Sequence, residues 1–267
     1  MFQSSILPEE LESLQLAAFD GPIHVIDREG PELEYAVKYL KRQKIIGFDT
    51  ESRPTFTPSQ PHYGVSLLQL SGAGEAFLFR VKLLGMDERI CRILADERIV
   101  KVGAAVKEDI RGIQKYRDFE PKNFIDLQKI VWEYGIRDKS VKKMSAIILG
   151  VRISKTQQLS NWEAEKLSEA QQKYAATDAW ICREMLKKLN RSEKNPLPEE
   201  EQLHSGPKEK AGNPDSRKNA DKGSVELNAQ PENQEKKKRK RRYYKHNHRH
   251  GRKSGRKEDV KNNTEKR

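Results

Sequence analysis

Two carboxylates stand close together at the end of an apolar segment near the start of the chain. The segment 44–51 has the pattern of a buried strand and acquires carboxylates at Asp49 and Glu51. Because side chains alternate between the two faces of a strand, these two carboxylates point the same way. Such a pair is costly unless a cation neutralises it, and its hard oxygen donors suit Mg²⁺ or Mn²⁺ better than zinc. A strand that ends in solvent at Glu51 is the alternative explanation.

Two further groups of polar residues fall on predicted helices. A helix that begins with Glu108 and Asp109 follows the predicted strand 99–104, and α/β sheets bind ligands at the carboxyl ends of their strands. A simple favourable interaction with the helix dipole is the alternative for this pair. Tyr174 and Asp178 are four residues apart on a later helix, so they share one face. The alanines around them favour close packing of that helix, which is the alternative explanation of this segment.

The segments between these residues alternate between strand and helix patterns. The two strands expected at 66–70 and 76–81 are separated by a short glycine-containing turn and predict a hairpin. This order predicts an α/β domain in which helices flank a mixed sheet. The other expected strands are 23–26, 44–51 and 99–104, and the expected helices are 8–19, 31–42, 86–95, 107–116, 127–134, 140–149 and 168–189.

The composition changes after residue 190. Residues 1–190 carry 29 Lys or Arg against 27 Asp or Glu, whereas residues 191–267 carry 23 against 13 and lack apolar periodicity. We therefore expect one folded domain followed by a basic, disordered tail. No apolar run is long enough to span a bilayer, and the N-terminus lacks the basic start of a signal peptide, which predicts a soluble, non-exported protein. Cys91 and Cys182 are expected to be ordinary thiols.

Three segments together resemble a known enzyme family. FDTE (48–51), VGAAVKED (102–109) and YAATD (174–178) are similar, in order, to motifs I, II and III of the DEDD superfamily of 3′-to-5′ exonucleases. The tyrosine in the third segment is typical of the DEDDy subclass, which includes ribonuclease D and the Werner-type exonuclease domain. The Ser-Asn-Trp element at 160–162 resembles the Werner type. The resemblance covers about residues 30–190, leaving 1–29 as an extension and 191–267 as the tail.

The resemblance implies a ribonuclease H-like fold with a two-metal site that holds Mg²⁺ or Mn²⁺. Asp49 would bridge both ions, Glu51 and Asp178 would complete the site for one, and Asp109 would support the other. Tyr174 would orient the attacking water and help to deprotonate it. The implied reaction removes nucleoside 5′-monophosphates from nucleic-acid 3′ ends, with DNA slightly preferred. One alternative is a ribonuclease D-like RNA-processing enzyme. The other is an inactive nucleic-acid-binding adaptor, and the presence of every motif residue disfavours the adaptor.

A few other residues are open to two interpretations. Asp126 is expected to cap a helix, and a contribution to the chemistry is the alternative. Trp162 is expected to pack in the core. The run of seven cations at 236–242, followed by aromatic residues, predicts contacts with the phosphate backbone. The same run is typical of a nuclear import signal, so we expect a nuclear location in a eukaryote and a cytoplasmic one in a bacterium. His62, Tyr63 and the lysines at 139, 142 and 143 are further candidates for substrate contact.

Overall fold

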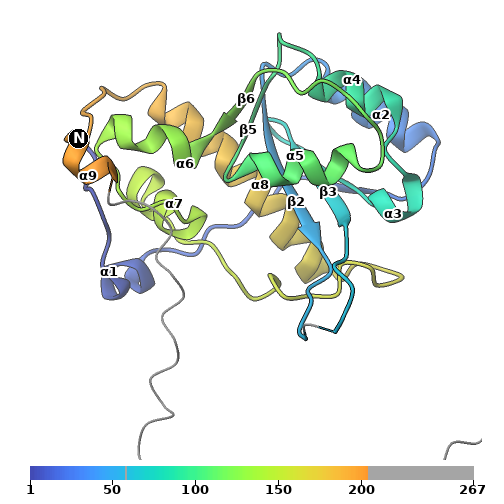
Figure 1. Ribbon diagram of the computed structural model, residues 1–267, viewed down its shortest axis with the longest axis horizontal. Helices are drawn as coiled ribbons and strands as arrows, with labels where there is room; N and C mark the ends of the chain where they lie inside the picture. Colours follow the sequence, from blue (N-terminus) through green and yellow to red (C-terminus); the bar gives the residue numbers. More distant parts are fainter. Residues whose placement is uncertain (58, 204–267) are drawn as a thin grey trace, which may run out of the picture. The chain divides into compact units, whose positions relative to one another are not determined.

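The computed structural model describes residues 1–57 and 59–203, and their strands form one mixed sheet (Figure 1). The strand order is β1-β4-β3-β2-β5-β6. The β2–β3 and β3–β4 pairs are antiparallel, whereas β1–β4, β2–β5 and β5–β6 are parallel. The predicted hairpin and α/β class are therefore confirmed. The strands are β1 (Ile23–Ile26), β2 (Ile45–Ser52), β3 (Val65–Ser71), β4 (Ala76–Phe79), β5 (Val100–Gly103) and β6 (Phe124–Asp126).

Helices cover both faces of this sheet. On one face, α2, α4 and α5 pack against a core that contains Phe48 and Leu68. On the other face, α7 and α8 form a second core around Val102. The helices are α1 (Pro8–Ser13), α2 (Pro31–Leu40), α3 (Val81–Leu84), α4 (Glu88–Leu94), α5 (Val106–Gln114), α6 (Leu127–Ile130), the 3₁₀-helix η1 (Val131–Tyr134), α7 (Val141–Leu149), α8 (Glu169–Leu189) and α9 (Glu199–Leu203).

The long helix α8 lies directly on β2. A Cβ atom added to Gly47 would lie 1.9 Å from the carbonyl oxygen of Ala179, so only glycine permits this approach. Ala175 and Ala176 are fully buried on the same helix. A capping box at Ser168 fixes the beginning of α8, because the Ser168 hydroxyl accepts from the amide of Gln171. The small residues of α8, which were predicted to allow close packing, therefore bring the helix that carries the third motif against the strand that carries the first motif.

The N-terminal segment departs from the sequence-based expectation. The helix expected at 8–19 ends at Ser13, and the chain continues in an extended form in which Leu16 bridges Arg152. The reason is tertiary: the Phe19 side chain is 3% exposed, and the Phe19 amide donates to the Thr177 hydroxyl of α8 at 2.9 Å. The bridge to Arg152 and the contacts of Phe19 with α8 therefore hold this segment in an extended form, which a continuous helix would not allow.

The expected domain limits at residues 30 and 190 cut through packed structure. β1 lies before residue 30 and pairs with β4. After residue 190, the amides of Asn195 and Leu197 donate to the carbonyls of Glu133 and Trp132, and the Leu197 side chain is buried. Residues 191–203 therefore extend the domain, and the basic run at 236–242 lies outside the described residues. Within the described part of the chain, no helix is long and apolar enough to cross a membrane.

Candidate metal centre

Three carboxylates from distant parts of the chain converge at the end of β2. Asp49 and Glu51 come from β2, and Asp178 comes from α8. Each offers one oxygen atom, and these three atoms lie within 4.8 Å of one another. The convergence follows from the close packing of α8 on Gly47, two residues before Asp49. The structure thus brings together three of the four carboxylates that the sequence motifs point to.

Burial and mutual repulsion make this cluster costly in its charged form. Burial raises the pKa of Asp49 well above its ordinary range, and the charges of Asp178, Glu51 and Asp109 raise it further. Burial and then the neighbouring carboxylates raise the pKa of Glu51 to about 9. Burial also raises the pKa of Asp178 to about 6, against the opposing effects of a hydrogen bond from Tyr174 and the charge of Lys155. A bound cation would relieve this repulsion.

The fourth carboxylate, Asp109, lies beside the trio rather than within it. Asp109 is in the first turn of α5 and accepts a hydrogen bond of 2.5 Å from the Thr50 hydroxyl of β2. Burial raises its pKa, and the hydrogen bond from Thr50 opposes that shift. Thr50 therefore couples α5 to the strand that carries Asp49 and Glu51. The sequence motif contains this threonine, but its role depends on the packing of α5 and was not predicted.

Asp126 has the structural role expected of a helix cap. Its carboxylate accepts from the amide of Gln128, at the beginning of α6, and from the amide of Ala105. Ala105 has a positive φ of 58° immediately before α5, a conformation that a non-glycine residue adopts only when its surroundings hold it there. Asp126 thereby fixes the turn that delivers Asp109.

Tyr174 lies one helical turn before Asp178 and is buried. Burial, followed by the charges of Asp178 and Glu51, raises the pKa of its hydroxyl above the ordinary tyrosine value. Tyr174 therefore keeps its proton and acts as a hydrogen-bond donor near the carboxylates. Its ring packs against the Trp162 ring with centroids 5.9 Å apart, and Trp162 is fully buried, as expected of a core residue.

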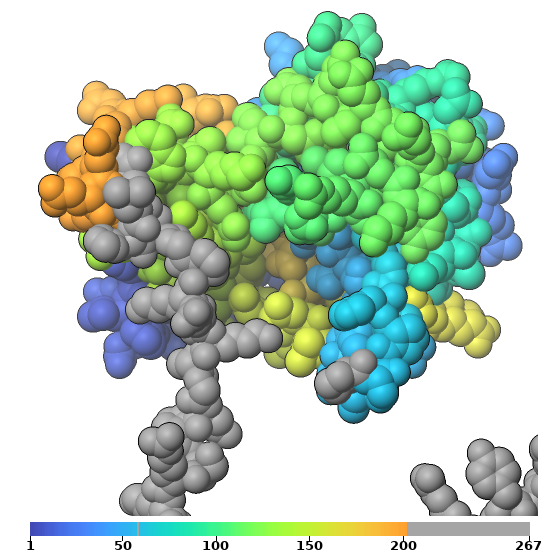
Figure 2. Space-filling model, in the orientation of Figure 1, coloured from blue at the N-terminus to red at the C-terminus, as the bar shows by residue number. Residues whose placement is uncertain are grey.

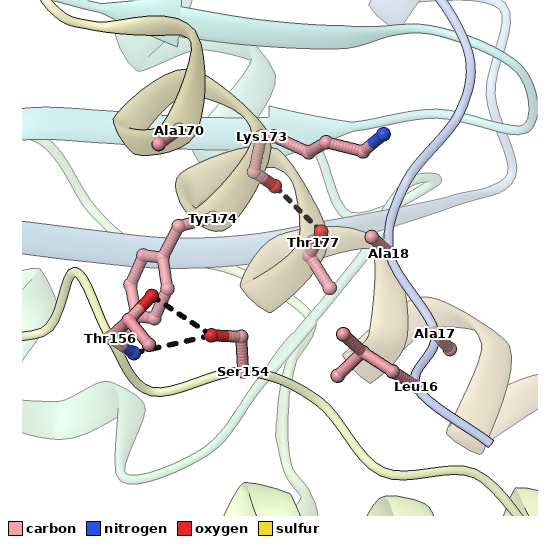
Figure 3. A pocket seen from close by; sticks show the side chains of 9 residues that line it. All are labelled: Leu16, Ala17, Ala18, Ser154, Thr156, Ala170, Lys173, Tyr174 and Thr177. Carbon is pink, nitrogen blue, oxygen red and sulfur yellow. Dashed lines mark hydrogen bonds between the residues drawn. The ribbon is translucent and has the colours of Figure 1, made fainter.

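A cavity of about 330 Å³ is lined in part by Tyr174, and Figure 3 shows the side chains around it. The N-terminal segment at 16–18 forms one wall, and Ser154 and Thr156 form another. The hydroxyls of Ser154 and Thr156 are 3.0 Å apart and hold this loop in a turn. Lys155 lies between them, exposed, and its charge lowers the pKa of Asp178. Sequence reasoning missed Lys155, for which the only signal was its position between the second and third motifs.

A second cavity, of about 180 Å³, lies next to the end of β2. It is lined by residues of the loop after β2 and by Leu159 and Asn161. Phe56 and Leu159 are each 68% exposed, and the Arg53 guanidinium lies 4.7 Å from the centre of the Tyr63 ring. Figure 2 shows this loop, in light blue, projecting from the surface.

The other candidates for substrate contact are placed less favourably. His62 is exposed and does not line the second cavity. Lys142 pairs with Glu12 at 2.6 Å, and Lys143 pairs with Asp138 at 2.9 Å, so both ammonium groups already have acidic partners. Within the described residues, the loop after β2 is therefore a better candidate for substrate contact than the lysines at 142 and 143.

The donor set suits a hard divalent cation. Asp49, Glu51 and Asp178 offer carboxylate oxygens alone, and Cys182 lies one turn along α8 as a buried thiol whose pKa is raised. Oxygen-only sites favour Mg²⁺ or Mn²⁺, whereas zinc sites are usually built from histidine and thiolate. The residues present therefore fit the type of ion that the sequence motifs imply.

Comparison with known proteins places the chain in a family. A family model described as 3′-5′ exonuclease matches residues 24–193, and the chain belongs to this family. It is 29% identical to "Ribonuclease D" of Gluconacetobacter diazotrophicus over 166 residues, covering 61% of this chain and 40% of that protein. It is 31% identical to "Exonuclease 3′-5′ domain-containing protein 2" of Drosophila melanogaster over 173 residues, covering 61% of this chain and 29% of that one.

Solved structures support the same fold. The Escherichia coli RNase D structure matches with a TM-score of 0.57 at 24% identity, covering 63% of this chain and 44% of that chain. The Aedes aegypti Nibbler EXO domain matches with a TM-score of 0.54 at 23% identity, covering 63% of this chain and 87% of that chain. These matches confirm the expected ribonuclease H-like fold, and the family model together with the relatives above confirms the expected DEDDy-type 3′-5′ exonuclease family. The chain spans less than half the length of the two relatives named above.

Proposed function

We propose that this protein is a divalent-metal-dependent 3′-to-5′ exonuclease that releases nucleoside 5′-monophosphates from nucleic-acid 3′ ends. The observation that carries the proposal is the convergence of Asp49, Glu51 and Asp178 within 4.8 Å, with Tyr174 beside them. An inactive adaptor would have no need for a buried, mutually repelling cluster, which costs stability when it has no cation. Family membership supports the same reaction.

Asp49, Glu51 and Asp178 would hold the metal, with Asp109 supporting a second ion. Two divalent ions in such a site supply activation of water near neutral pH and charge compensation at the leaving 3′ oxygen. The chain's own residues set the positions of the reacting groups. Thr50 orients Asp109 by its hydrogen bond, and Asp126 fixes the turn before α5.

Tyr174 serves as a hydrogen-bond donor in this scheme and not as the base. Its raised pKa keeps the hydroxyl protonated at neutral pH, so the hydroxyl can donate to Asp178 or to the attacking water but cannot remove a proton. This limits the role that the family resemblance implies. Trp162 packs against the Tyr174 ring. This packing restricts the rotation of the Tyr174 ring and holds its hydroxyl toward the carboxylates.

The cavity beside the loop after β2 is the proposed site for the terminal nucleotides. An exposed aromatic ring at Phe56 and a cation at Arg53 supply the stacking and charge that single-stranded nucleic acid requires. DNA is the proposed preferred substrate, on the resemblance of residues 160–162 to the Werner-type element. RNA is the second candidate, supported by the similarity to ribonuclease D.

Hydrolysis of matched strands tests both parts of the proposal. The protein is incubated with Mg²⁺ or Mn²⁺ and with 5′-labelled DNA and RNA of one sequence, single-stranded and duplex, and an Asp49→Asn variant serves as the control. A ladder that shortens from the 3′ end, and mononucleotide 5′-phosphates as the released product, are expected from the wild type alone. Products that the Asp49→Asn variant forms equally well would reject the proposal. Faster loss of RNA than of DNA would reverse the assigned preference.

A further inference from the structure

Gln69 of β3 is a polar side chain for which the site described above has no use. It is completely buried, and both its amide nitrogen and its amide oxygen lack a hydrogen-bond partner among the described residues. A buried amide without partners costs free energy, and buried polar side chains in native proteins are nearly always hydrogen-bonded. The two atoms therefore point to hydrogen bonds that form only in the functional state.

The strand register places Gln69 next to the metal centre. Gln69 pairs with Asp49 on one side and with Leu78 on the other, and Leu78 pairs with Val25. These four residues form one row across the sheet, on the face covered by α8. Side chains directly opposite in an antiparallel pair have Cβ atoms roughly 4.5 to 5.5 Å apart. The Gln69 amide consequently lies within side-chain reach of the Asp49 carboxylate.

Two other polar neighbours already have partners, whereas the indole N–H of Trp162, which packs with Leu67 and Leu78, has none among the described residues. The hydroxyl of Ser71, two residues along the strand, donates to the carbonyl of Gly72. The guanidinium of Arg80, which directly follows β4, donates to the carbonyls of Ala164 and Glu165. Leu67 and Leu78 offer no polar atoms. Asp49, and diagonally Glu51, are the acceptors that remain on this face among the described residues.

We propose that Gln69 is a positioning residue of the metal centre: when the site holds its ions, the amide N–H of Gln69 donates to the Asp49 carboxylate and fixes the orientation in which that carboxylate faces the ions. This proposal rests on the proposed function, because it deepens the account of the same site. Groups that hold a metal ligand through hydrogen bonds strengthen metal binding and activity, by factors of roughly 10 to 100. Fixing Asp49 matters most, since it is the carboxylate assigned to both ions.

The decisive measurement is the affinity of the full-length protein for Mn²⁺. Gln69→Met keeps the length of the side chain and removes both polar atoms, and Leu78→Met is the matched control on the opposite side of the same row. We expect Gln69→Met to bind Mn²⁺ roughly 10- to 100-fold more weakly, with Leu78→Met unchanged. Removing an unpartnered buried amide leaves the stability of the metal-free protein equal or higher. The kcat should fall, recover partly at high Mn²⁺, and leave the KM for the strand unchanged.

Two outcomes separate this proposal from the proposed function. A folded Gln69→Met variant that binds Mn²⁺ as tightly as the wild type, while the wild type hydrolyses strands, overturns the positioning role alone. Weaker Mn²⁺ binding in the variant, combined with no hydrolysis by the wild type, supports the positioning role and rejects the exonuclease. If Gln69→Met does not fold, the side-chain amide signal of Gln69 in a ¹⁵N spectrum decides. A shift on addition of Mg²⁺ to the wild type supports the contact, and an unmoved signal refutes it.

Discussion

Tyr174 and Asp178 lie one helical turn apart on α8, and each shifts the pKa of the other: the Tyr174 hydroxyl lowers the pKa of Asp178, and the Asp178 charge raises that of Tyr174. The effect of the Tyr174 hydroxyl on Asp178 opposes the effect of burial on the same carboxylate. One helix thereby supplies both a candidate metal ligand and the donor that keeps the ligand charged. The arrangement requires a protonated tyrosine, which its raised pKa provides.

Replacement of Tyr174 by phenylalanine tests this arrangement. The Tyr174→Phe variant keeps the ring that packs on Trp162 and removes only the hydroxyl. We expect single-turnover rates to fall by roughly 10²- to 10⁴-fold, with strand affinity unchanged, because only the positioning of a proton and of the water is lost. Tyr134→Phe, at a buried tyrosine of the second core, is the control. A Tyr174→Phe variant with wild-type turnover would remove the hydroxyl from the mechanism.

Neutralising Asp49 should separate stability from activity. The Asp49→Asn variant loses a ligand, so hydrolysis should be abolished, whereas the free energy of unfolding of the metal-free protein should hold or rise because repulsion with Glu51 and Asp178 is relieved. Denaturant unfolding in the presence of a chelator and strand hydrolysis with Mg²⁺ check the two parts. The exposed Asp118→Asn is the control and should change neither. Early unfolding of Asp49→Asn with retained hydrolysis would contradict the assignment.

The residues that were predicted and those that were missed differ in the range of their interactions. Asp49 and Glu51 were predicted because strand alternation is a local property, and Asp178 and Tyr174 because helical spacing is local too. The hydrogen bond from Thr50 to Asp109 depends on how α5 packs against β2, which no local pattern contains. Likewise, the family motifs single out the four acids, but the position of Asp109 beside the other three depends on the packing of α5 and α8 against β2.

Tertiary contacts also explain the errors in the fold. The helix expected through Phe19 ended at Ser13 because Phe19 is captured by α8, a contact across most of the chain. The strand β6 was missed because it has only three residues, too few for a pattern of alternation. Residues 191–203 were assigned to the tail on composition, yet Leu197 finds a buried position against the domain.

The loop after β2 should contribute to substrate affinity and not to the chemical step. Phe56→Ala removes an exposed ring, and loss of stacking on one base is expected to weaken binding by roughly 1 to 3 kcal/mol. The kcat at saturating strand should stay within a factor of about two, since no proposed ligand is altered. Fluorescence anisotropy with a labelled single strand measures the affinity. Leu83→Ala, at another exposed apolar residue, is the control, and an equal loss in both variants would argue against stacking.

Lys101 predicts a pH dependence of stability that is independent of the metal centre. Its side chain is buried, and the ammonium group donates to the carbonyls of Asp96 and Ile99 at 2.7 and 2.8 Å. Burial lowers its pKa to about 8. Below about pH 8 the folded and unfolded states both carry the proton, so the cost of burying the charge is fully present. Between about pH 8 and 10.5 the folded state has lost this proton while the unfolded state still carries it. The free energy of unfolding therefore rises with pH in this range, relative to a chain without this group.

Comparison with Lys101→Met isolates this effect, because other groups that titrate at alkaline pH are common to both proteins. The free energy of unfolding of the wild type should rise relative to the variant by about 1 to 2 kcal/mol between pH 7.5 and pH 10. Urea unfolding across this range, in the presence of a chelator, is the measurement. A difference between the two proteins that stays constant with pH would show that the ammonium group remains charged in the folded state.

The basic segment beyond the described residues supplies the last prediction, which follows from charge alone. Residues 1–190 are nearly neutral, whereas the segment after Gln230 contains the run of seven cations at 236–242. If this segment tethers the protein to long strands, its deletion should reduce affinity for long oligonucleotides and hardly affect short ones. Counterion release makes log K fall with log salt by about 0.7 to 0.9 for each phosphate neutralised, so the deletion should also flatten the salt dependence.

Activity at saturating substrate should survive the deletion, because Asp49, Glu51, Asp109, Tyr174 and Asp178 all precede the cut. A protein with the same number of residues after Gln230, in which the cations at 236–242 are replaced by glutamine, controls for chain length. It should behave as the deletion does if charge is the cause. Equal salt slopes for the wild type and the deletion would defeat the tether and leave nuclear import as the proposed role of the run, to be checked by the location of a fluorescent fusion.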